Sequence, residues 1–547
     1  MLTRPTVSRS RAWVTVLVAG MATAPAAPSE LHAQLLPVGD SWDDYVRVLD
    51  AIGIARTGSL TVRPSPIGWT LDGVSDTLPH PWAGRLASPP ARALGTEVSL
   101  VLSDPGARAF LNTSRPLGPN EGSGWAGRGI TTAVDAGASL VWGPVTASFH
   151  PTVAFAQNRE FELAPVSLGG LPRYAYPWRW IDLPQRFGPD SFWTFDPGQS
   201  HLRIRIGGVV AGVGTESLWW GPGLRNGILM SNNAPGFPHA LLGTSQPVRI
   251  GIGSLEAQWI WGRLDSSDWF DTTFVVPNRY LTGAVVTISP DWLDGLHVGA
   301  SRVFYRDIPE DGLPFGEHFL VFQGVSKEAF GTPNNPSGED ERSQMFAAFF
   351  RWAFPSTAFE LWLEWARNDH GWNLRDYFLE PEHASGRTFG LRKVVALSGN
   401  RLLSLEAEIT SLQRSSTSAL RDVPTYYAHH LVLQGYTQRG RVIGASVGPG
   451  GSAQYVGISL YAPWGRSALL VQRRVVDNDA YYSRFAADQE WCCHHGFLDL
   501  GAEVTAFLGN VELGATGTLS RELNRYFRKN SDHWNLSLRM EARWRPR

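Results

Sequence analysis

Apolar and polar residues alternate along most of this chain, in stretches that end at short turns rich in Gly, Pro and Asn. In the stretch 401–412, four apolar residues interleave with four polar ones: Leu403, Leu405, Ala407 and Ile409 with Ser404, Glu406, Glu408 and Thr410. A period of two places successive side chains on opposite faces of a strand. The pattern therefore predicts an all-β chain, built either as a soluble sandwich or as a membrane barrel.

The amino-terminal residues have the layout of a secretory signal. Three basic residues come first: Arg4, Arg9 and Arg11. An apolar stretch at 12–24 follows, and Leu31-His32-Ala33 and Ala24-Pro25-Ala26 both fit a cleavage site. The apolar stretch is shorter than the roughly 20 residues of a spanning helix, which favours a signal over a membrane anchor. We predict a signal peptide over residues 1–33.

Composition favours the barrel over the sandwich. After the signal, no segment approaches the roughly 18 uninterrupted apolar residues of a membrane helix. The chain has 23 Trp, and Trp is enriched where membrane meets water. Its 48 basic and 50 acidic residues nearly balance, so no nucleic-acid partner is expected. We therefore predict an outer-membrane protein whose barrel exterior contacts outer-membrane lipid.

The alternating stretches predict a transmembrane antiparallel β-barrel of about 18 strands over residues 96–547. The predicted strands are 129–141, 145–156, 202–206, 246–253, 255–264, 279–288, 295–304, 346–352, 359–365, 386–397, 401–412, 453–461, 467–475, 496–508, 511–520 and 534–544, with less distinct ones before and between them. In the last strand, Trp534 and Trp544 end the apolar face, as two aromatic girdles require.

Loop lengths predict the orientation of the barrel. Short turns are typical of the periplasmic side, and long loops of the extracellular side. The predicted long loops are 158–200, 213–246, 305–342, 413–428 and 476–495. A basic side chain facing lipid at mid-bilayer costs about 2–4 kcal/mol, so charged strand residues should face the lumen. These are Glu360, Glu364, Glu406, Glu408, Asp499, Glu503, Glu512, Arg203, Arg205, Arg539 and Glu541. The lumen is open, or plugged if long loops fold into it.

We predict that residues 34–95 form a short periplasmic segment before the barrel, partly helical and partly irregular. Asp40-Ser41 can cap a helix that Gly53 can end. Between them, Trp42, Tyr45, Val46, Leu49 and Ile52 follow helical spacing. Such a helix either packs at the base of the barrel or docks a partner protein.

Motifs for catalysis and metal binding are weak. Residues 444–448 match G-x-S-x-G around Ser446, but that motif needs a helix after it, and Pro449-Gly450-Gly451 follows. No spacing ties His429-His430 to Ser446, so no catalytic residue is predicted. Residues 492–495 read Cys-Cys-His-His, without the gaps of known zinc sites. No metal or cofactor is predicted, and a bond between the adjacent cysteines would be an uncommon feature.

Three strings of residues are distinctive together. They are ESLWWGPG at 216–223 with SNNAP at 231–235, EWARNDH at 364–370, and YAHH at 427–430 with GYTQRGR at 435–441 and GPG at 448–450. In these strings the chain resembles the Wzi family of outer-membrane capsule assembly proteins, most clearly from about residue 200 onward. The resemblance implies an 18-stranded barrel with a small periplasmic helical part. It also implies a non-enzymatic surface lectin that holds capsular polysaccharide, with periplasmic capsule-export machinery as a further possible partner.

Two sets of candidate site residues follow. We interpret the motif residues as structural or lumen-lining: Trp219, Trp220, Gly221, Pro222, Asn232, Asn233, Glu364, Asp369, His430, Tyr436 and Arg441. Sugars present hydroxyl groups and an apolar ring face, so loop aromatics near Asn and Asp are candidate glycan contacts: Trp178, Trp180, Trp193, Trp372 and Tyr377. For any single one of these rings, packing in a loop or a place in a girdle is the favoured interpretation.

The predicted function is attachment of capsular or other surface polysaccharide at the outer membrane. The alternatives are a substrate-selective porin-like channel, an outer-membrane hydrolase that uses Ser446, and a biogenesis scaffold that uses the helix at 42–52.

Overall fold

The computed structural model describes residues 35–66, 74, 79–86, 91–94, 98–166, 171–270, 278–324, 342–368, 373–486 and 492–545. The predicted signal peptide at 1–33, together with Asp369 and Trp372, lies outside these described residues. Among the described helices, none has the length and apolar character that a membrane crossing requires.

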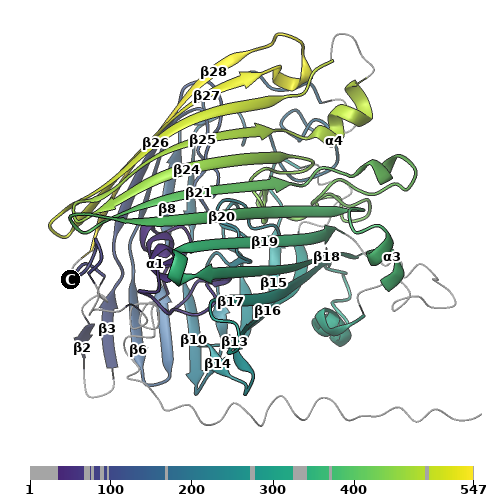
Figure 1. Cartoon of the computed structure of the whole chain (residues 1–547). Helices are drawn as coiled ribbons and strands as arrows, with labels where there is room; N and C mark the ends of the chain where they lie inside the picture. Colours follow the sequence, from purple (N-terminus) through teal and green to yellow (C-terminus); the bar gives the residue numbers. More distant parts are fainter. Residues whose placement is uncertain are drawn as a thin grey trace, which may run out of the picture.

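Twelve long antiparallel strands form two thirds of a curved wall (Figure 1). They are β15 (Gly253–Asp265), β16 (Asn278–Pro290), β17 (Leu296–Asp307), β18 (Arg342–Phe354), β19 (Phe359–Asn368), β20 (Ser385–Leu397), β21 (Arg401–Ser411), β24 (Ser452–Ala462), β25 (Gly465–Val475), β26 (Gly496–Leu508), β27 (Val511–Leu523) and β28 (His533–Trp544). Each of them pairs with the next along the chain.

The first part of the wall consists of interrupted strands. Their pieces are β3 (Val98–Leu102) with β4 (Gly106–Asn112), β5 (Gly129–Asp135) with β6 (Ala138–Trp142), β7 (Val145–Phe149) with β8 (Thr152–Ala156), and β9 (Phe192–Asp196) with β10 (His201–Ile206). Pro105, Pro151 and Pro197 lie at three of these breaks, because proline cannot donate a ladder hydrogen bond. β11 (Val209–Gly214) and β13 (His239–Thr244) follow, with β14 (Val248–Arg249) as a short extension before β15.

The wall closes on itself, because β28 pairs with β4 in antiparallel register. Four interrupted strands, β11, β13 and the twelve long strands together make 18 wall strands within the described residues. The predicted number of strands is therefore confirmed. One strand prediction was wrong, because the predicted strand 246–253 forms only the two residues of β14 before β15 begins. Two loop predictions were wrong as well: β13 lies inside the predicted loop 213–246, and β9 lies inside the predicted loop 158–200. Both strands are short and flanked by proline, which hides their alternation.

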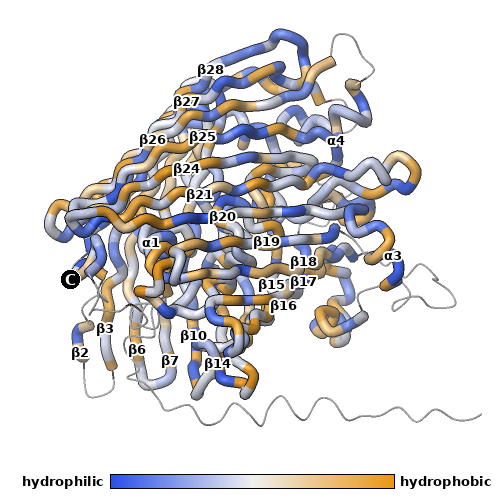
Figure 2. Tube along the Cα trace, viewed as in Figure 1, coloured by the Kyte–Doolittle hydropathy of each residue, from blue (hydrophilic) through white to orange (hydrophobic). Residues whose placement is uncertain are grey.

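Burial confirms the two faces of the wall. On β26, Leu498 and Leu500 are exposed on the outside, whereas Asp499 between them is buried inside. Trp534 and Trp544 lie exposed on the outer face at opposite ends of β28, as the predicted girdles require. Figure 2 shows the alternation of apolar and polar positions along the strands.

Turn lengths divide the barrel into two ends. Two residues, Pro463-Trp464, join β24 to β25, and Gly509-Asn510 join β26 to β27. We call this the short-turn end. The connections at the opposite, loop end are far longer, and the one between β21 and β24 spans 412–451. The predicted asymmetry of turns and loops is present.

Helix α1 (Ser41–Ala51) lies inside the barrel at the short-turn end (Figure 1). Its amino-terminus is capped as predicted, because the Asp40 carboxylate accepts a hydrogen bond from the Trp42 amide at 2.9 Å. Tyr45 and Leu49 are fully buried and pack in one cluster with wall residues that include Tyr461. Of the two interpretations of this helix, the structure shows the packing element.

Segments from the loops also fill the lumen. One buried cluster joins Trp220, Met230 and Tyr436 of inserted segments to wall residues such as Val285 and Val303. Within the insert, β1 (Val62–Arg63) pairs with β12 (Trp219–Trp220), and β22 (Thr437–Gln438) with β23 (Arg441–Val442). The lumen is therefore plugged. The remaining elements are β2 (Ala91–Ala93), η1 (Phe315–Phe322), η3 (Pro355–Thr357), α3 (Leu374–Leu379), η4 (Ser416–Ala419), α4 (Asn478–Ala480), η5 (Tyr481–Phe485) and η6 (Arg525–Phe527).

Candidate functional site

The rim of the barrel is lower at one place on the loop end. β11 ends at Gly214 and β13 begins at His239, and these two residues pair with each other. Beyond that level, β9 continues on one side, and β15 continues past Gly262 to Asp265 on the other. β9 pairs with β8, and among the described residues no strand pairs with its other edge. We call the space between β9 and residues 263–269 the rim notch.

The rim notch contains a cavity of about 580 Å³ with aromatic walls. The Trp125 ring meets Phe187 edge-on at 4.7 Å between centroids. Trp269 meets Tyr174 in the same way at 5.4 Å. Gly188 packs so closely that a Cβ there would lie 2.4 Å from the Trp269 ring, so a larger residue would displace the indole. Trp125, Phe187 and Trp269 each remain half-buried, with part of the ring open to the cavity.

Charged groups bridge the notch at its floor. Arg439 donates a hydrogen bond to Asp196 of β9 at 3.0 Å, and its guanidinium lies 3.7 Å from Asp265 of β15. Arg441 donates to the carbonyl oxygens of Gly122 and, at 2.8 Å, Gly124. Burial lowers the pKa of Arg441 to about 10, although Glu121 opposes the shift. Arg439 keeps 39% of its side chain exposed, so it can still meet a ligand.

Buried polar groups hold the aromatic walls in place. Asn158 donates to the carbonyl oxygens of Phe187 at 2.9 Å and Gly188 at 3.0 Å, and accepts from the Trp125 indole at 3.3 Å. On the other wall, Asp182 accepts from the amide of Ser267 at 2.7 Å and from its hydroxyl at 2.5 Å. Burial raises the pKa of Asp182, and the hydrogen bonds from Ser267 oppose that rise. The walls are thus preorganised.

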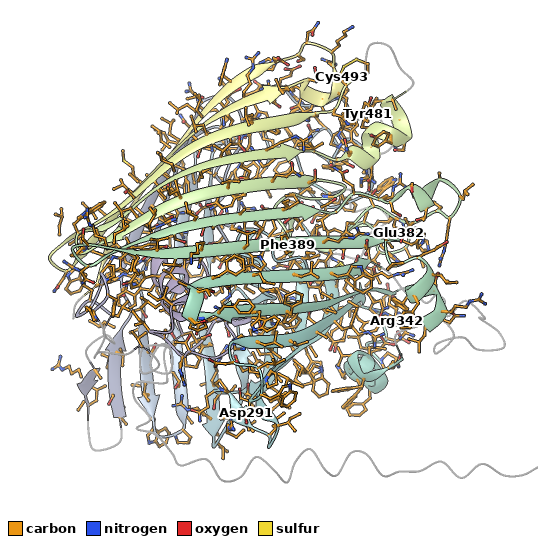
Figure 3. All side chains as sticks on the ribbon, viewed as in Figure 1. Asp291, Arg342, Glu382, Phe389, Tyr481 and Cys493 are labelled. Atoms are coloured by element: carbon orange, nitrogen blue, oxygen red, sulfur yellow. A yellow bond between two sulfur atoms is a disulfide. The ribbon has the colours of Figure 1, made fainter. Side chains whose placement is uncertain are left out.

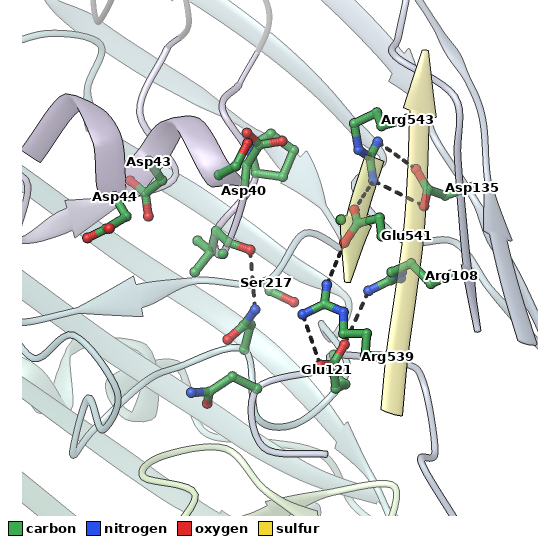
Figure 4. Close-up of a pocket in the computed structure, with 18 of the residues that line it drawn as sticks. Asp40, Asp43, Asp44, Arg108, Glu121, Asp135, Ser217, Arg539, Glu541 and Arg543 are labelled. Atoms are coloured by element: carbon green, nitrogen blue, oxygen red, sulfur yellow. Dashed lines mark hydrogen bonds and ion pairs between the residues drawn. The ribbon is translucent and has the colours of Figure 1, made fainter. Parts of the chain in front are cut away.

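A second cavity, of about 380 Å³, lies in the lumen beside the start of α1 (Figure 4). Its walls carry many charges, and most of them are paired. Arg543 lies 3.0 Å from Asp135, Arg539 lies 3.2 Å from Glu121, and Arg108 lies 3.6 Å from the same Glu121. Figure 4 shows these pairs side by side. Most of the charges on the walls of this cavity are therefore used in ion pairs with one another.

The WWGPG residues of the motif lie in the lumen. Trp220 is fully buried and donates from its indole to Gln258 at 3.0 Å. The Arg63 guanidinium lies over the buried Trp219 ring at 4.8 Å. The Gly221 amide donates to Thr61 at 2.8 Å, and the Pro222 carbonyl accepts from Arg47 at 2.6 Å. These contacts attach the amino-terminal segment to the inserted loop.

Other motif residues hold the inserted segments together. Asn232 donates to the Val38 carbonyl at 3.2 Å, and Asn233 donates to the Val442 carbonyl at 2.9 Å. Glu364 is fully buried and accepts from the Ile228 amide at 3.3 Å. The Tyr436 ring stacks beside Tyr427 at 6.1 Å.

Two motif residues stand apart from the buried set. His430 is exposed in its loop, with its ring 4.6 Å from that of His429, so it does not line the lumen. Arg441 lines the rim notch itself. Asp369 lies outside the described residues.

The predicted glycan-contacting aromatics do not gather at one site. Trp178 is buried against Phe485 and Phe527. Trp180 is half-buried near Phe270, and Tyr377 of α3 lies under Arg367 at 4.6 Å. Trp193 does not lie in a loop, as predicted, but projects from the outer face of β9, where it is 72% exposed. Trp372 lies outside the described residues.

The candidate catalytic and metal motifs have other contacts. Ser446 donates to the Asn226 side-chain oxygen at 3.0 Å, and turns follow it where the hydrolase motif needs a helix. Cys492 and Cys493 are joined by a disulfide at the loop end, near Tyr481 (Figure 3). His494 bonds Asn478, and His495 bonds Glu522. In the part of the chain that the structure describes, no His, Cys, Asp or Glu cluster is arranged to hold a metal ion.

Sequence reasoning missed most residues of the rim notch. Trp125, Phe187 and Trp269 come from three different loops and Asp265 from the end of β15, and only the closed wall brings them together. Arg439 lies inside the quoted string at 435–441, but its role depends on carboxylates far away in the sequence. The one available signal was Trp269 next to Ser267 and Asp268, an aromatic ring beside hydrogen-bonding groups in a loop.

A closed antiparallel wall of 18 strands, apolar outside and filled inside, defines this chain as an outer-membrane β-barrel protein. The family model "Capsule assembly protein Wzi" matches residues 122–480, about two thirds of the chain. The chain therefore belongs to the Wzi capsule assembly family.

The chain is similar to several solved structures. Wzi of Escherichia coli is 13% identical, with a TM-score of 0.61 over 93% of this chain and 99% of that one. It is described as an outer-membrane protein involved in group 1 capsule assembly and as a carbohydrate-binding β-barrel. A BenF-like porin from Pseudomonas fluorescens is 11% identical, with a TM-score of 0.39 over 83% of this chain and all of its own. OprD from Pseudomonas aeruginosa is 10% identical, with a TM-score of 0.38 over 83% and 95% of the two chains. No curated protein matches the chain.

Proposed function

We propose that this protein binds capsular or related surface polysaccharide in the rim notch and so helps to hold it on the cell. The observation that carries the proposal is the cavity of about 580 Å³ at the loop end, with aromatic walls and a charged floor. Trp125 and Trp269 offer ring faces for the apolar face of a sugar. Arg439 and Asp265 offer charged hydrogen-bond partners for its hydroxyl groups.

An unpaired hydroxyl supports a polar ligand in the same place. Ser266 lines the notch, and its Oγ is buried with no hydrogen-bond partner in the structure. A buried polar group without a partner costs about 1–3 kcal/mol, and rotation of the Ser266 side chain toward the cavity would let a sugar hydroxyl remove that cost. Membership of the Wzi family, whose Escherichia coli protein is described as carbohydrate-binding, supports the same ligand class.

Two features favour attachment over the alternatives. The filled lumen opposes passage of a substrate, because Trp220, Met230 and Tyr436 lie inside the barrel and are fully buried. Ser446 has an amide oxygen, rather than a histidine, as its hydrogen-bond partner, which opposes a nucleophilic role. We therefore propose a binding protein without catalytic activity.

The proposal is tested in cells that lack the gene and are complemented with variants. Cells with the wild-type protein should retain surface polysaccharide, and cells with Trp269→Ala should release more of it into the medium. Trp292→Ala is the matched control, because Trp292 is 67% exposed at the short-turn end, away from the notch. Normal retention by cells that lack the protein altogether would contradict the proposal.

A further inference from the structure

The cavity of the rim notch runs along the open edge of β9. It contacts all five residues of β9, including Trp193 and Phe195 on the outer face and Asp196 on the inner face. Successive strand residues face opposite sides, so a cavity that meets all five lies along the edge of the strand, where its outer and inner faces meet. That edge of β9 has no strand partner among the described residues, which leaves it open.

The opening lies at the level where membrane meets water. Along β9 and β10, the outward side chains are apolar from Ile206 near the short turn up to Trp193. Immediately before Trp193, Ser191 and Asp190 are exposed and polar. Trp favours this boundary, so Trp193 marks the outer edge of the apolar band.

The two sides of the opening differ in chemistry. Outside, Trp193 and Phe195 are 72% and 63% exposed, and Phe155 lies 5.1 Å from the Trp193 ring, which makes an aromatic patch. Inside, Arg439 and Asp265 present charged groups to the same cavity. A ligand that occupies both sides must therefore be apolar at one end and rich in hydroxyl groups at the other.

We infer that the rim notch takes the membrane-proximal part of an outer-leaflet glycolipid, with its sugars inside and its acyl chains against Trp193 and Phe195. The inference rests on the proposed function of the notch and narrows it, because a free polysaccharide would contact only the inner groups. The protein would then hold surface sugar where it leaves the membrane. The lipid anchor would keep the ligand concentrated in the plane of the opening.

The test uses the full-length protein in amphipol and three probes. The probes are lipopolysaccharide of the producing strain, its sugar portion released by mild acid, and free capsular polysaccharide. We expect lipopolysaccharide to bind about tenfold more tightly than its sugar portion, because two aromatic side chains gain apolar contacts. The double variant W193S/F195S should abolish that difference. Trp534→Ser is the control, because Trp534 is an exposed outer-face tryptophan on β28, a strand that does not line the notch.

The outcomes separate the two proposals. Equal affinity for lipopolysaccharide and its sugar portion, with free capsular polysaccharide still bound, would overturn the glycolipid inference and leave the proposed function standing. Failure of all three probes to bind would overturn both. A dimer joined through the open edge of β9, and not dissociated by lipopolysaccharide, would also overturn the inference. The comparison of lipopolysaccharide with its sugar portion needs only wild-type protein, so it stands if the double variant fails to fold.

Discussion

The two ends of the lumen are built from similar residues and differ in how much of their charged and aromatic side chains remains exposed. At the short-turn end, α1 is fixed by ion pairs with the wall: Arg47 with Glu360 at 2.7 Å, Asp50 with Arg351 at 2.6 Å, Asp44 with Arg392 at 2.5 Å and, just before the helix, Asp40 with Arg545 at 2.8 Å. At the loop end, Arg439 is 39% exposed, the Ser266 hydroxyl has no partner and Trp269 is half-buried.

This difference indicates that the short-turn end stabilises the fold, whereas the rim notch at the loop end is suited to binding a ligand. Buried charges are tolerated only when they are paired, and α1 meets that condition through Glu360, Arg351 and Arg392 of three wall strands, β19, β18 and β20. A ligand site instead keeps a few polar groups and ring faces free in a cavity. Substitutions at the short-turn end should therefore act on stability, and substitutions in the rim notch on affinity.

The largest effect is expected for Arg351→Met at the short-turn end. Arg351 is fully buried and bonds both Glu360 and Asp50 at 2.6 Å. Removing it leaves these carboxylates short of a partner, which should lower the free energy of unfolding by about 3–5 kcal/mol. The midpoint of thermal unfolding in detergent measures the loss. An unchanged midpoint would contradict the assignment of this end to structure.

The second-largest loss of stability is expected at Glu408, whose carboxylate holds residues 224–226 of the inserted loop. Glu408 accepts from the amides of Leu224, Arg225 and Asn226 at 2.6–3.0 Å. Glu408→Ala leaves these buried donors unpaired and should cost about 3 kcal/mol. The same unfolding measurement applies, together with protease cleavage after Arg225. Glu541→Ala is the control, because Glu541 keeps 26% of its side chain exposed, and it should cost about 1 kcal/mol or less.

Acid should weaken the loop end through His495. Burial lowers the pKa of this histidine to about 4, although its hydrogen bond with Glu522 opposes the shift. An unfolded histidine titrates near 6.5, so between these values the unfolded chain binds more protons. Stability then falls as the pH drops through this window, by about 2 kcal/mol between pH 7 and 5. Unfolding midpoints at the two pH values measure the loss.

His495→Gln should remove most of that pH dependence, because glutamine can still donate to Glu522 and does not titrate. His430→Gln serves as the comparison, because the His430 ring is exposed in its loop. If both variants keep the wild-type pH dependence, another group is responsible for the acid sensitivity.

The smallest effect on stability is expected for Arg439→Gln. Its ion pair with Asp196 is partly exposed, and such pairs contribute about 1 kcal/mol or less. The variant should unfold near the wild-type midpoint and bind polysaccharide more weakly, since the charge that meets the ligand is gone. Titration of polysaccharide into the purified variant measures the second effect. A large loss of stability with unchanged affinity for polysaccharide would contradict the assignment of the rim notch to binding.

The features predicted from the sequence were those that local pattern determines. The alternation around Asp499 and the cap at Asp40 depend on neighbours in the chain, and both occur as expected. β13 was missed because its partners lie on the adjacent strands β11 and β15, not in its own short pattern. The rim notch was missed for the same reason, because Trp125 and Trp269 meet only after the wall has closed.

The central claim is that the rim notch, and no other tryptophan-bearing surface of the barrel, binds the polysaccharide. The most direct test is the equilibrium affinity of purified wild-type, Trp269→Ala and Trp292→Ala proteins for the surface polysaccharide in one detergent. We expect about a tenfold loss of affinity for Trp269→Ala, since a stacked ring contributes on the order of 1 kcal/mol, and no change for Trp292→Ala. Equal affinities for all three proteins would contradict the claim.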